Sequence, residues 1–296
     1  MSQVWVPTEV AAATRNQVGE GPVWMADEER LLWVDITRHL VQWFDPRSGG
    51  VQLLDVGRDV GAVAPTTWSG LVAALPGEFA LVSPDGAVRS VATVEAERPG
   101  NRMNDGKCDS QGRFWAGTMA YDLTPDAAAL YRLNTDCSAE LVVEPVTLSN
   151  GIGWSPDDRL MYYIDSTTQR LDVFDFDAPS GQLRGRRTVA QIPRGDGMPD
   201  GLTVDAEGCI WVAFWGGSAV RRFTPDGRED LVIELPVSQV TSCAFGGTDL
   251  SDLYITSAAT GLSEEQLGKE PHAGALFRCR PGQQGLPPNR FAGCTG

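Results

Sequence analysis

The sequence reads NGIGW at residues 150–154 and MYYID at residues 161–165, and this pair of segments decides the fold because it recurs along the chain. An earlier instance reads EGPVW at residues 20–24 and LLWVD at residues 31–35. Both open with a polar residue next to glycine, enter a short apolar segment, turn, and continue with a second apolar segment. A period of about 40 to 50 residues built from short strands is typical of a β-propeller, in which each repeat forms one blade.

The same frame occurs six times. The other four opening segments, each with its second segment, are GAVA (61–64) with LVAA (71–74), DGKCD (105–109) with RFWAGT (113–118), DGLTV (200–204) with IWVAF (210–214), and SCAF (242–245) with LYIT (253–256). Residues 109–112, 155–158 and 205–208 have the composition of hairpin turns. The repeat therefore predicts an all-β, six-bladed β-propeller that forms a single domain over residues 1–296.

The last repeat lacks a clear fourth strand. After ALFRC at residues 275–279 the chain becomes rich in proline and glycine. An unassigned apolar segment lies ahead of the first repeat, around Val4 to Val10. We expect this N-terminal strand to complete the last blade, because it would close the ring and cover an exposed sheet edge.

Superimposing the six repeats brings together one position from each. Equivalent positions of a propeller lie on a common ring around the central axis. We expect these residues just before the innermost strand of each blade, with their side chains converging on one point. Three are carboxylates and one is a carboxamide; the six positions are Glu20, Val60, Asp105, Asn150, Asp200 and Ser242.

Turn formation is the alternative explanation, because Asp-Gly and Asn-Gly are common turn pairs. Asp85-Gly86 and Asp226-Gly227 are such pairs, and both are expected between outer strands. Glu20 shares the opening register although Glu-Gly has no turn preference, which favours the ring. Acidic side chains in one place repel one another unless a cation neutralises them. Oxygen donors without His or Cys suit a hard ion such as Ca²⁺, Mg²⁺ or Mn²⁺.

Composition excludes several classes of function. The formal net charge of -15 argues against a nucleic-acid partner, since phosphate binding depends on clustered Lys and Arg. No apolar run approaches the roughly 20 residues that span a bilayer, and the first residues do not resemble a signal peptide. We therefore expect a cytoplasmic protein that binds neither nucleic acid nor membrane. The sequence does not indicate the oligomeric state.

Cysteine and histidine usage limits the chemistry further. The six cysteines form no Cys-x-x-Cys pair, and we expect all of them to be reduced thiols. There are two histidines, His39 in an expected hairpin turn and His272 in an expected loop. No Gly-x-Ser-x-Gly motif is present, so neither a Ser-His-Asp triad nor a zinc site with several histidines is expected.

The chain resembles the SMP-30/gluconolactonase (regucalcin-like) family over nearly its whole length. The motifs that carry the resemblance are EGPVW (20–24), NRMNDGK (101–107), GRFWAGTM (112–119), SNG (149–151) and PDG (199–201). The resemblance implies a six-bladed propeller that hydrolyses sugar lactones and binds one divalent metal through Glu20, Asn150 and Asp200. Ca²⁺ is the first expectation, with Mg²⁺, Mn²⁺, Zn²⁺ or Fe²⁺ as alternatives.

The resemblance also implies roles for four further residues. Arg102 and Asn104 are expected to contact the sugar, and so is Asp122, where some relatives have Glu. Asp105 is expected either beside the metal ligands or as a base. For Arg102, neutralising the acidic ring is an alternative role, and for Asn104, capping a turn.

The expected reaction is metal-dependent opening of an aldonolactone to the open-chain aldonate. Asp200 would act as general base toward water, with Asp105 as the other candidate. Two other functions fit the same residues: a Ca²⁺-binding regulatory propeller without catalysis, and a metal-dependent hydrolase of another electrophile such as a phosphotriester. The sequence alone does not indicate which sugar lactone is preferred.

Overall fold

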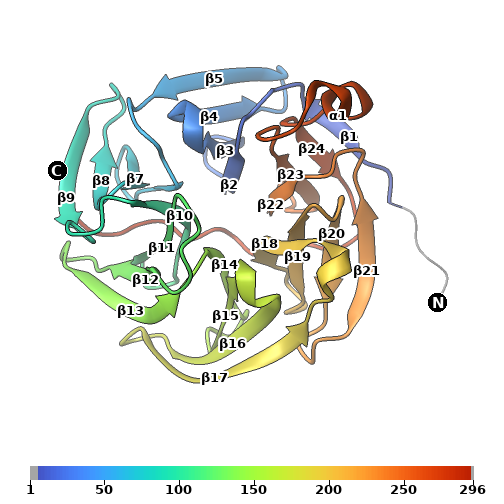
Figure 1. The fold of residues 1–296 in the computed structure, drawn as a ribbon. Coiled ribbons are helices and arrows are strands. Elements are labelled where there is room, and N and C mark those ends of the chain that lie inside the picture. Colours follow the sequence, from blue (N-terminus) through green and yellow to red (C-terminus); the bar gives the residue numbers. More distant parts are fainter. Residues whose placement is uncertain (1–5, 295–296) are drawn as a thin grey trace.

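The computed structural model describes residues 6–294 and consists of six four-stranded antiparallel sheets around a central axis (Figure 1). The first blade comprises β2 (Gly19–Met25), β3 (Arg30–Asp35), β4 (Leu40–Asp45) and β5 (Gly50–Asp55). The second comprises β6 (Ala62–Pro65), β7 (Leu71–Leu75), β8 (Glu78–Val82) and β9 (Val88–Thr93). The third comprises β10 (Asn101–Cys108), β11 (Phe114–Ala120), β12 (Ala128–Leu133) and β13 (Ala139–Val146).

The second half of the chain repeats this arrangement. The fourth blade comprises β14 (Ser149–Trp154), β15 (Leu160–Asp165), β16 (Arg170–Asp177) and β17 (Gln182–Gln191). The fifth comprises β18 (Met198–Val204), β19 (Ile210–Trp215), β20 (Ala219–Phe223) and β21 (Glu229–Glu234). The sixth comprises β22 (Val240–Gly246), β23 (Asp252–Ser257), β24 (Leu276–Cys279) and β1 (Glu9–Ala12). The six-bladed propeller predicted from the repeat is confirmed.

The N-terminal strand closes the ring as predicted. β1 pairs antiparallel with β24, so the last blade combines the two ends of the chain. The strand covers Glu9–Ala12 rather than the expected Val4 to Val10, of which residues 4 and 5 lie outside the described residues. Pro7, within the expected segment, has no N–H to donate to a ladder and lies outside the paired strand.

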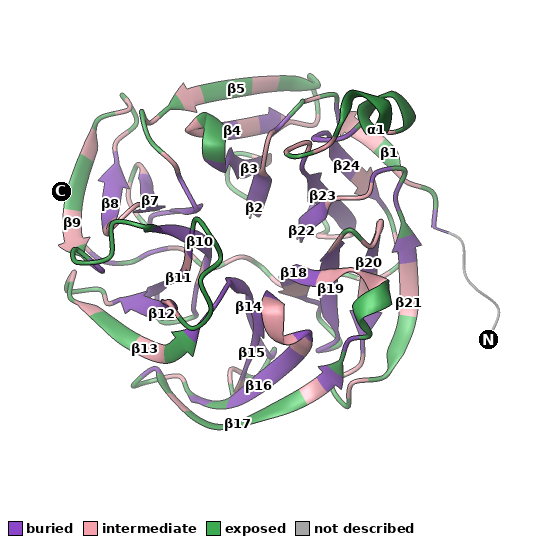
Figure 2. Cartoon of the chain, viewed as in Figure 1, coloured by how far each residue is buried: buried purple, intermediate pink, exposed green. Residues whose placement is uncertain are grey.

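Burial falls from the axis outward (Figure 2). All residues of the innermost strand β2 are buried, whereas the outermost β5 has only exposed or half-buried ones. Aromatic side chains fill the wedges between blades. Trp115 of the third blade packs edge-on against Trp154 and Phe176 of the fourth, with ring centroids 5.9 and 6.1 Å away. Such contacts hold neighbouring blades in fixed register.

Aspartates at strand ends fix the loops beside the axis. In the two repeats quoted first, Asp35 and Asp165 end the second strand of their blade. The carboxylate of Asp165 accepts hydrogen bonds from the backbone N–H groups of Thr147 and Leu148, at 3.2 and 3.1 Å, just before β14. Asp35 receives the equivalent bonds before β2. These bonds anchor the chain where it enters the innermost strand.

Because the strands of each sheet alternate in direction, loops that connect equivalent strands in different blades lie on the same face of the propeller. The innermost strands all begin on one face, which we call the ring face. The connection from the second to the third strand of each blade lies there, and so does the connection between blades. The short 3₁₀ helices η1 (Ile36–Arg38), η2 (Ser166–Thr168) and η3 (Arg194–Asp196) occupy such connections, as does α1 (Glu264–Lys269). None of the helices in the described part of the chain is long and apolar enough to cross a membrane.

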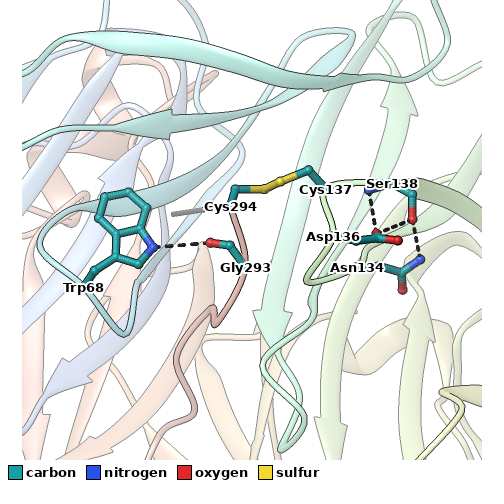
Figure 3. The surroundings of a disulfide bond; sticks show 7 residues. All are labelled: Trp68, Asn134, Asp136, Cys137, Ser138, Gly293 and Cys294. Atoms are coloured by element: carbon teal, nitrogen blue, oxygen red, sulfur yellow. Dashed lines mark hydrogen bonds between the residues drawn. A yellow bond between two sulfur atoms is a disulfide. The ribbon is translucent and has the colours of Figure 1, made fainter. Parts of the chain in front are cut away.

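The expectation that all six cysteines are reduced was wrong for two of them. Cys137 and Cys294 form a disulfide across 157 residues of sequence (Figure 3). The C-terminal segment returns to the third blade, where the backbone N–H of Cys294 donates to the carbonyl of Thr135 at 3.3 Å, and this return brings the two sulfurs together. Sequence spacing gave no sign of it. The other four cysteines are free and buried.

Candidate metal and substrate site

The four predicted oxygen donors lie inside the innermost strands, not before them as we expected. Glu20 belongs to β2, Asp105 to β10, Asn150 to β14 and Asp200 to β18. Strand pairing shifts register at each of these positions, between Glu20 and Val23, Met103 and Gly106, Ser149 and Ile152, and Pro199 and Leu202. A β-bulge redirects a side chain. The bulges explain how residues inside inner strands can turn their side chains toward the axis.

The two remaining ring positions contribute differently. Val60 precedes β6 and packs in an apolar cluster, so the second blade offers no side-chain oxygen there. Ser242 lies at a register shift in β22, like its counterparts. A Cβ atom placed on Gly201 would lie 2.2 Å from the Ser242 hydroxyl oxygen, so only glycine lets β18 and β22 approach this closely.

Burial and mutual repulsion dominate the electrostatics of the ring. Glu20, Asp105 and Asp200 are each no more than 5% exposed. Burial, reinforced by the charge of Asp105, raises the pKa of Glu20 to about 8. Burial also raises the pKa of Asp200 well above its usual range, and the charges of Glu20 and Asp105 add to this. The protein thus gathers carboxylates whose ionised forms need a cation.

Two cations of the protein itself lie near the ring. Lys107 donates from Nζ to the carbonyl of Leu202 at 2.6 Å, and its charge opposes the rise in the pKa of Asp105 that burial causes. Arg102 is 8% exposed; burial lowers its pKa, and Asp59, Tyr121, Glu20 and Asp200 oppose that change. Three carboxylates against two cations leave the fully ionised ring with a net charge of about -1, which a divalent ion would reverse.

Asn150 is held by hydrogen bonds on both ends of its amide. Its Oδ1 accepts from Asn104 Nδ2 at 3.0 Å, and its Nδ2 donates to the Ser166 hydroxyl at 2.9 Å. Asn104 Nδ2 also donates to the carbonyl of Ser149 at 2.8 Å. This network fixes Oδ1 as the oxygen that faces Asn104, and a carbonyl oxygen has a second lone pair available for a metal.

Arg102 and Asn104 are joined to each other. The guanidinium of Arg102 donates to Asn104 Oδ1 at 2.8 Å and to the carbonyl of Met103 at 2.9 Å. Through Asn104 the guanidinium is therefore connected to Asn150. The structure brings both predicted sugar contacts next to the ring, while the contact with substrate itself stays a prediction.

Asp122 lies elsewhere. It occupies the exposed connection from β11 to β12, where its Oδ1 accepts from the Thr124 hydroxyl at 2.6 Å and the Thr124 backbone N–H at 2.9 Å. These hydrogen bonds lower the pKa of Asp122. Its neighbour Tyr121 donates its hydroxyl proton to Asp59 Oδ2 at 2.6 Å. The charge of Asp59 in turn opposes the lowering of the Arg102 pKa by burial. A role for Asp122 in binding substrate remains a prediction.

Sequence reasoning missed Asp59 and Tyr121. Asp59 directly precedes Val60, the ring position of the second blade. Superimposing the repeats singles out Val60 and gives no indication that its neighbour has a role. Tyr121 precedes Asp122 in a loop, and the repeating strand pattern does not predict the conformation of that loop. His39, expected in a hairpin turn, is in one: it follows η1 with φ 64° and its Nε2 lies 3.2 Å from Asp59 Oδ1.

A second acidic cluster on the opposite face does not need a metal. Among the described residues, one possible ligand atom each from Asp205, Glu207 and Cys209 lies within 4.8 Å of the others. Arg222 already pairs with both carboxylates; its Nε donates to Asp205 at 2.8 Å and its Nη2 to Glu207. The guanidinium supplies the positive charge that a metal would bring.

Comparisons with a family profile and with known proteins point to the same family. The sequence profile described as "SMP-30/Gluconolactonase/LRE-like region" matches residues 18–259. Regucalcin of Danio rerio is 42% identical over 294 residues, which cover 97% of this chain and 99% of that protein. The Bacillus subtilis protein named "Putative sugar lactone lactonase YvrE" is 37% identical over 284 residues, which cover 95% of this chain and 97% of that protein.

Solved structures agree with the sequence relatives. A calcium-binding protein, regucalcin from Agrobacterium tumefaciens, superimposes with a TM-score of 0.94 at 28% identity and covers 98% of this chain and 99% of that one. The luciferin-regenerating enzyme superimposes with a TM-score of 0.91 at 30% identity, covering 97% of this chain and 99% of that one. These matches confirm the family resemblance that the sequence motifs indicated.

Proposed function

Because the chain belongs to the SMP-30/gluconolactonase/LRE-like family, we propose that it hydrolyses a sugar-acid lactone to the open-chain aldonate with a divalent metal ion. The ring of buried carboxylates carries this proposal, because it concentrates negative charge where the side chains of four inner strands converge. The printed name of the Bacillus subtilis relative supports a sugar lactone as the substrate.

The residues of the ring fit a hard cation. Glu20, Asn150 and Asp200 would supply carboxylate and carboxamide oxygens, the donors that Ca²⁺ and Mg²⁺ prefer. Ca²⁺ is our first choice, and the description of the Agrobacterium tumefaciens relative as a calcium-binding protein supports it. When bound, such an ion polarises a carbonyl group and lowers the pKa of water.

The side chains around the ring supply binding and proton transfer. Arg102 can donate to the lactone carbonyl or to a ring hydroxyl, since a planar guanidinium offers several donors. Asn104 holds Asn150 in its orientation and can offer its amide to the sugar. Asp200, as a carboxylate, would take a proton from the attacking water and pass it to the ring oxygen that leaves as the ester bond breaks. Asp105 is the alternative base.

A binding function without catalysis is the second candidate. The description of the Agrobacterium tumefaciens relative names calcium binding. The same ring would serve both functions, but the sugar contacts expected of Arg102 and Asn104 and the printed name of the Bacillus subtilis relative favour an enzyme. A direct assay of turnover separates the two.

A panel of aldonolactones (glucono, galactono, xylono and arabinono) tests the proposal. Proton release is followed with protein that has been treated with a chelator and then reloaded with single metals. We expect acceleration over spontaneous opening only after a metal is restored. Equal rates with and without metal would contradict the proposal, and metal binding without acceleration of any lactone would favour the regulatory alternative.

A further inference from the structure

Three connections on the ring face meet at Asp59. Asp59 lies between β5 and β6, His39 between β3 and β4, and Tyr121 between β11 and β12. These connections come from the first and third blades and from the crossing between the first two (Figure 1). Backbone hydrogen bonds from Val56 to His39, at 2.9 Å, and from Tyr121 to Gly100, at 2.9 Å, hold the loops in place.

The carboxylate of Asp59 joins the other two side chains. Its Oδ2 accepts the hydroxyl proton of Tyr121 at 2.6 Å, and its Oδ1 lies 3.2 Å from Nε2 of His39. A carboxylate has about four lone-pair positions, so two such contacts leave acceptor capacity free. Tyr121 is 53% exposed although it is aromatic, and it therefore presents its ring to solvent on the ring face.

This rim cluster (His39, Asp59 and Tyr121) borders the buried site. Strand pairing sets Arg102 opposite Met119, two residues before Tyr121, and Asp59 directly precedes the ring position Val60. Asp59 and Tyr121 also counteract the lowering of the Arg102 pKa that burial causes. Arg102 in turn donates to Asn104, which bonds to Asn150 of the ring. A line of polar groups thus runs from the ring, through Arg102, to the solvent-facing rim.

We propose that the rim cluster binds the hydroxyl groups of the lactone on the side away from its carbonyl, and so selects polyhydroxylated lactones over unsubstituted ones. The inference rests on the proposed lactonase function. It assigns the recognition of the substrate's hydroxyl groups to the rim cluster. The free acceptor positions of Asp59 receive hydroxyl protons in charge-assisted hydrogen bonds. The Tyr121 hydroxyl donates to Oδ2 and holds the carboxylate in the orientation that leaves its other acceptor positions for the substrate.

Two lactones of equal ring size test the inference. Glucono-δ-lactone carries hydroxyl groups, whereas δ-valerolactone has none. The readout is the ratio of kcat/KM for the two substrates, measured with metal-loaded Asp59→Asn and Tyr121→Phe. We expect the ratio to fall about tenfold or more in Asp59→Asn, because its hydrogen bonds to the substrate lose their charge, and severalfold in Tyr121→Phe, because Asp59 loses the donor that orients it. The loss should be in KM for glucono-δ-lactone.

Asp226→Asn is the matched control, because Asp226 lies in an exposed hairpin between β20 and β21 on the opposite face. Its ratio should equal that of the wild-type protein. If the wild type opens both lactones but neither rim variant changes the ratio, the rim assignment is wrong and the lactonase function stands. If the wild type accelerates neither lactone, the lactonase function fails and the rim assignment with it.

Discussion

Neutralising one ring carboxylate should stabilise the protein when no metal is present. The substitution is Glu20→Gln, which keeps an oxygen to accept from the backbone N–H of Gly21, a bond of 2.9 Å in the wild type. Burial and Asp105 raise the pKa of Glu20 from 4.5 to about 8. The metal-free native state therefore holds a proton that the unfolded chain has already released over this pH range.

The sign and size of the effect follow from proton linkage. Because the native state binds more protons, the free energy of unfolding of metal-free wild type falls as pH rises from 4.5 to about 8. At about 1.4 kcal/mol per pKa unit, Glu20 accounts for a loss of about 4 kcal/mol by pH 8. Glu20→Gln avoids this loss. We expect its Tm after chelation to exceed that of wild type on the order of 10 °C at pH 8, with little difference at pH 4.5.

The assay is thermal unfolding at pH 4.5 and pH 8, with chelator and with excess Ca²⁺. Excess Ca²⁺ should reverse the order at pH 8, because only the wild type gains the free energy of ion binding. Glu97→Gln, at an exposed position, is the control and should leave Tm unchanged under all conditions. A Glu20→Gln variant that is less stable than wild type in chelator at pH 8 would refute the reasoning.

Three further predictions concern other parts of the molecule. Asp165→Ala leaves the N–H groups of Thr147 and Leu148 without their acceptor, so the free energy of unfolding in urea should fall by about 2–4 kcal/mol; a change below 1 kcal/mol contradicts the anchoring role. Asn104→Ala removes the donor that orients Asn150, and calorimetry should show Ca²⁺ affinity about tenfold weaker, whereas unchanged affinity would show that the contact is dispensable. Denatured, unreduced protein should react with four equivalents of a thiol reagent, and six would exclude the disulfide.

The blade repeat made the fold predictable. Five of the six repeats open with a polar residue and all six carry two apolar strands, so the number of blades and the shared register of Glu20, Asn150 and Asp200 could be predicted without knowing any long-range contact. The missing strand of the last blade pointed to its replacement from the N-terminus. Local patterns sufficed because each blade is built largely from consecutive strands.

The features that could not be predicted depend on contacts between distant residues, which a sequence repeat does not indicate. The bulges that place ring residues inside their strands arise from pairing between strands, and the sequence marks only a polar residue beside glycine. The loop that exposes Asp122 and turns Tyr121 toward Asp59 follows its own hydrogen bonds. The disulfide joins residues 157 positions apart because the C-terminal segment returns to the third blade, which the pattern of cysteines does not indicate.

We propose that one divalent ion held by Glu20, Asn150 and Asp200 is required for lactone hydrolysis. The most direct test titrates Ca²⁺ or Mn²⁺ into chelated protein and records bound metal and the rate of glucono-δ-lactone opening in the same sample. The rate should rise in proportion to bound metal and saturate at one ion per chain, and Asp200→Asn should show neither binding at this level nor acceleration. Full activity in the chelated protein, or in Asp200→Asn, would contradict it.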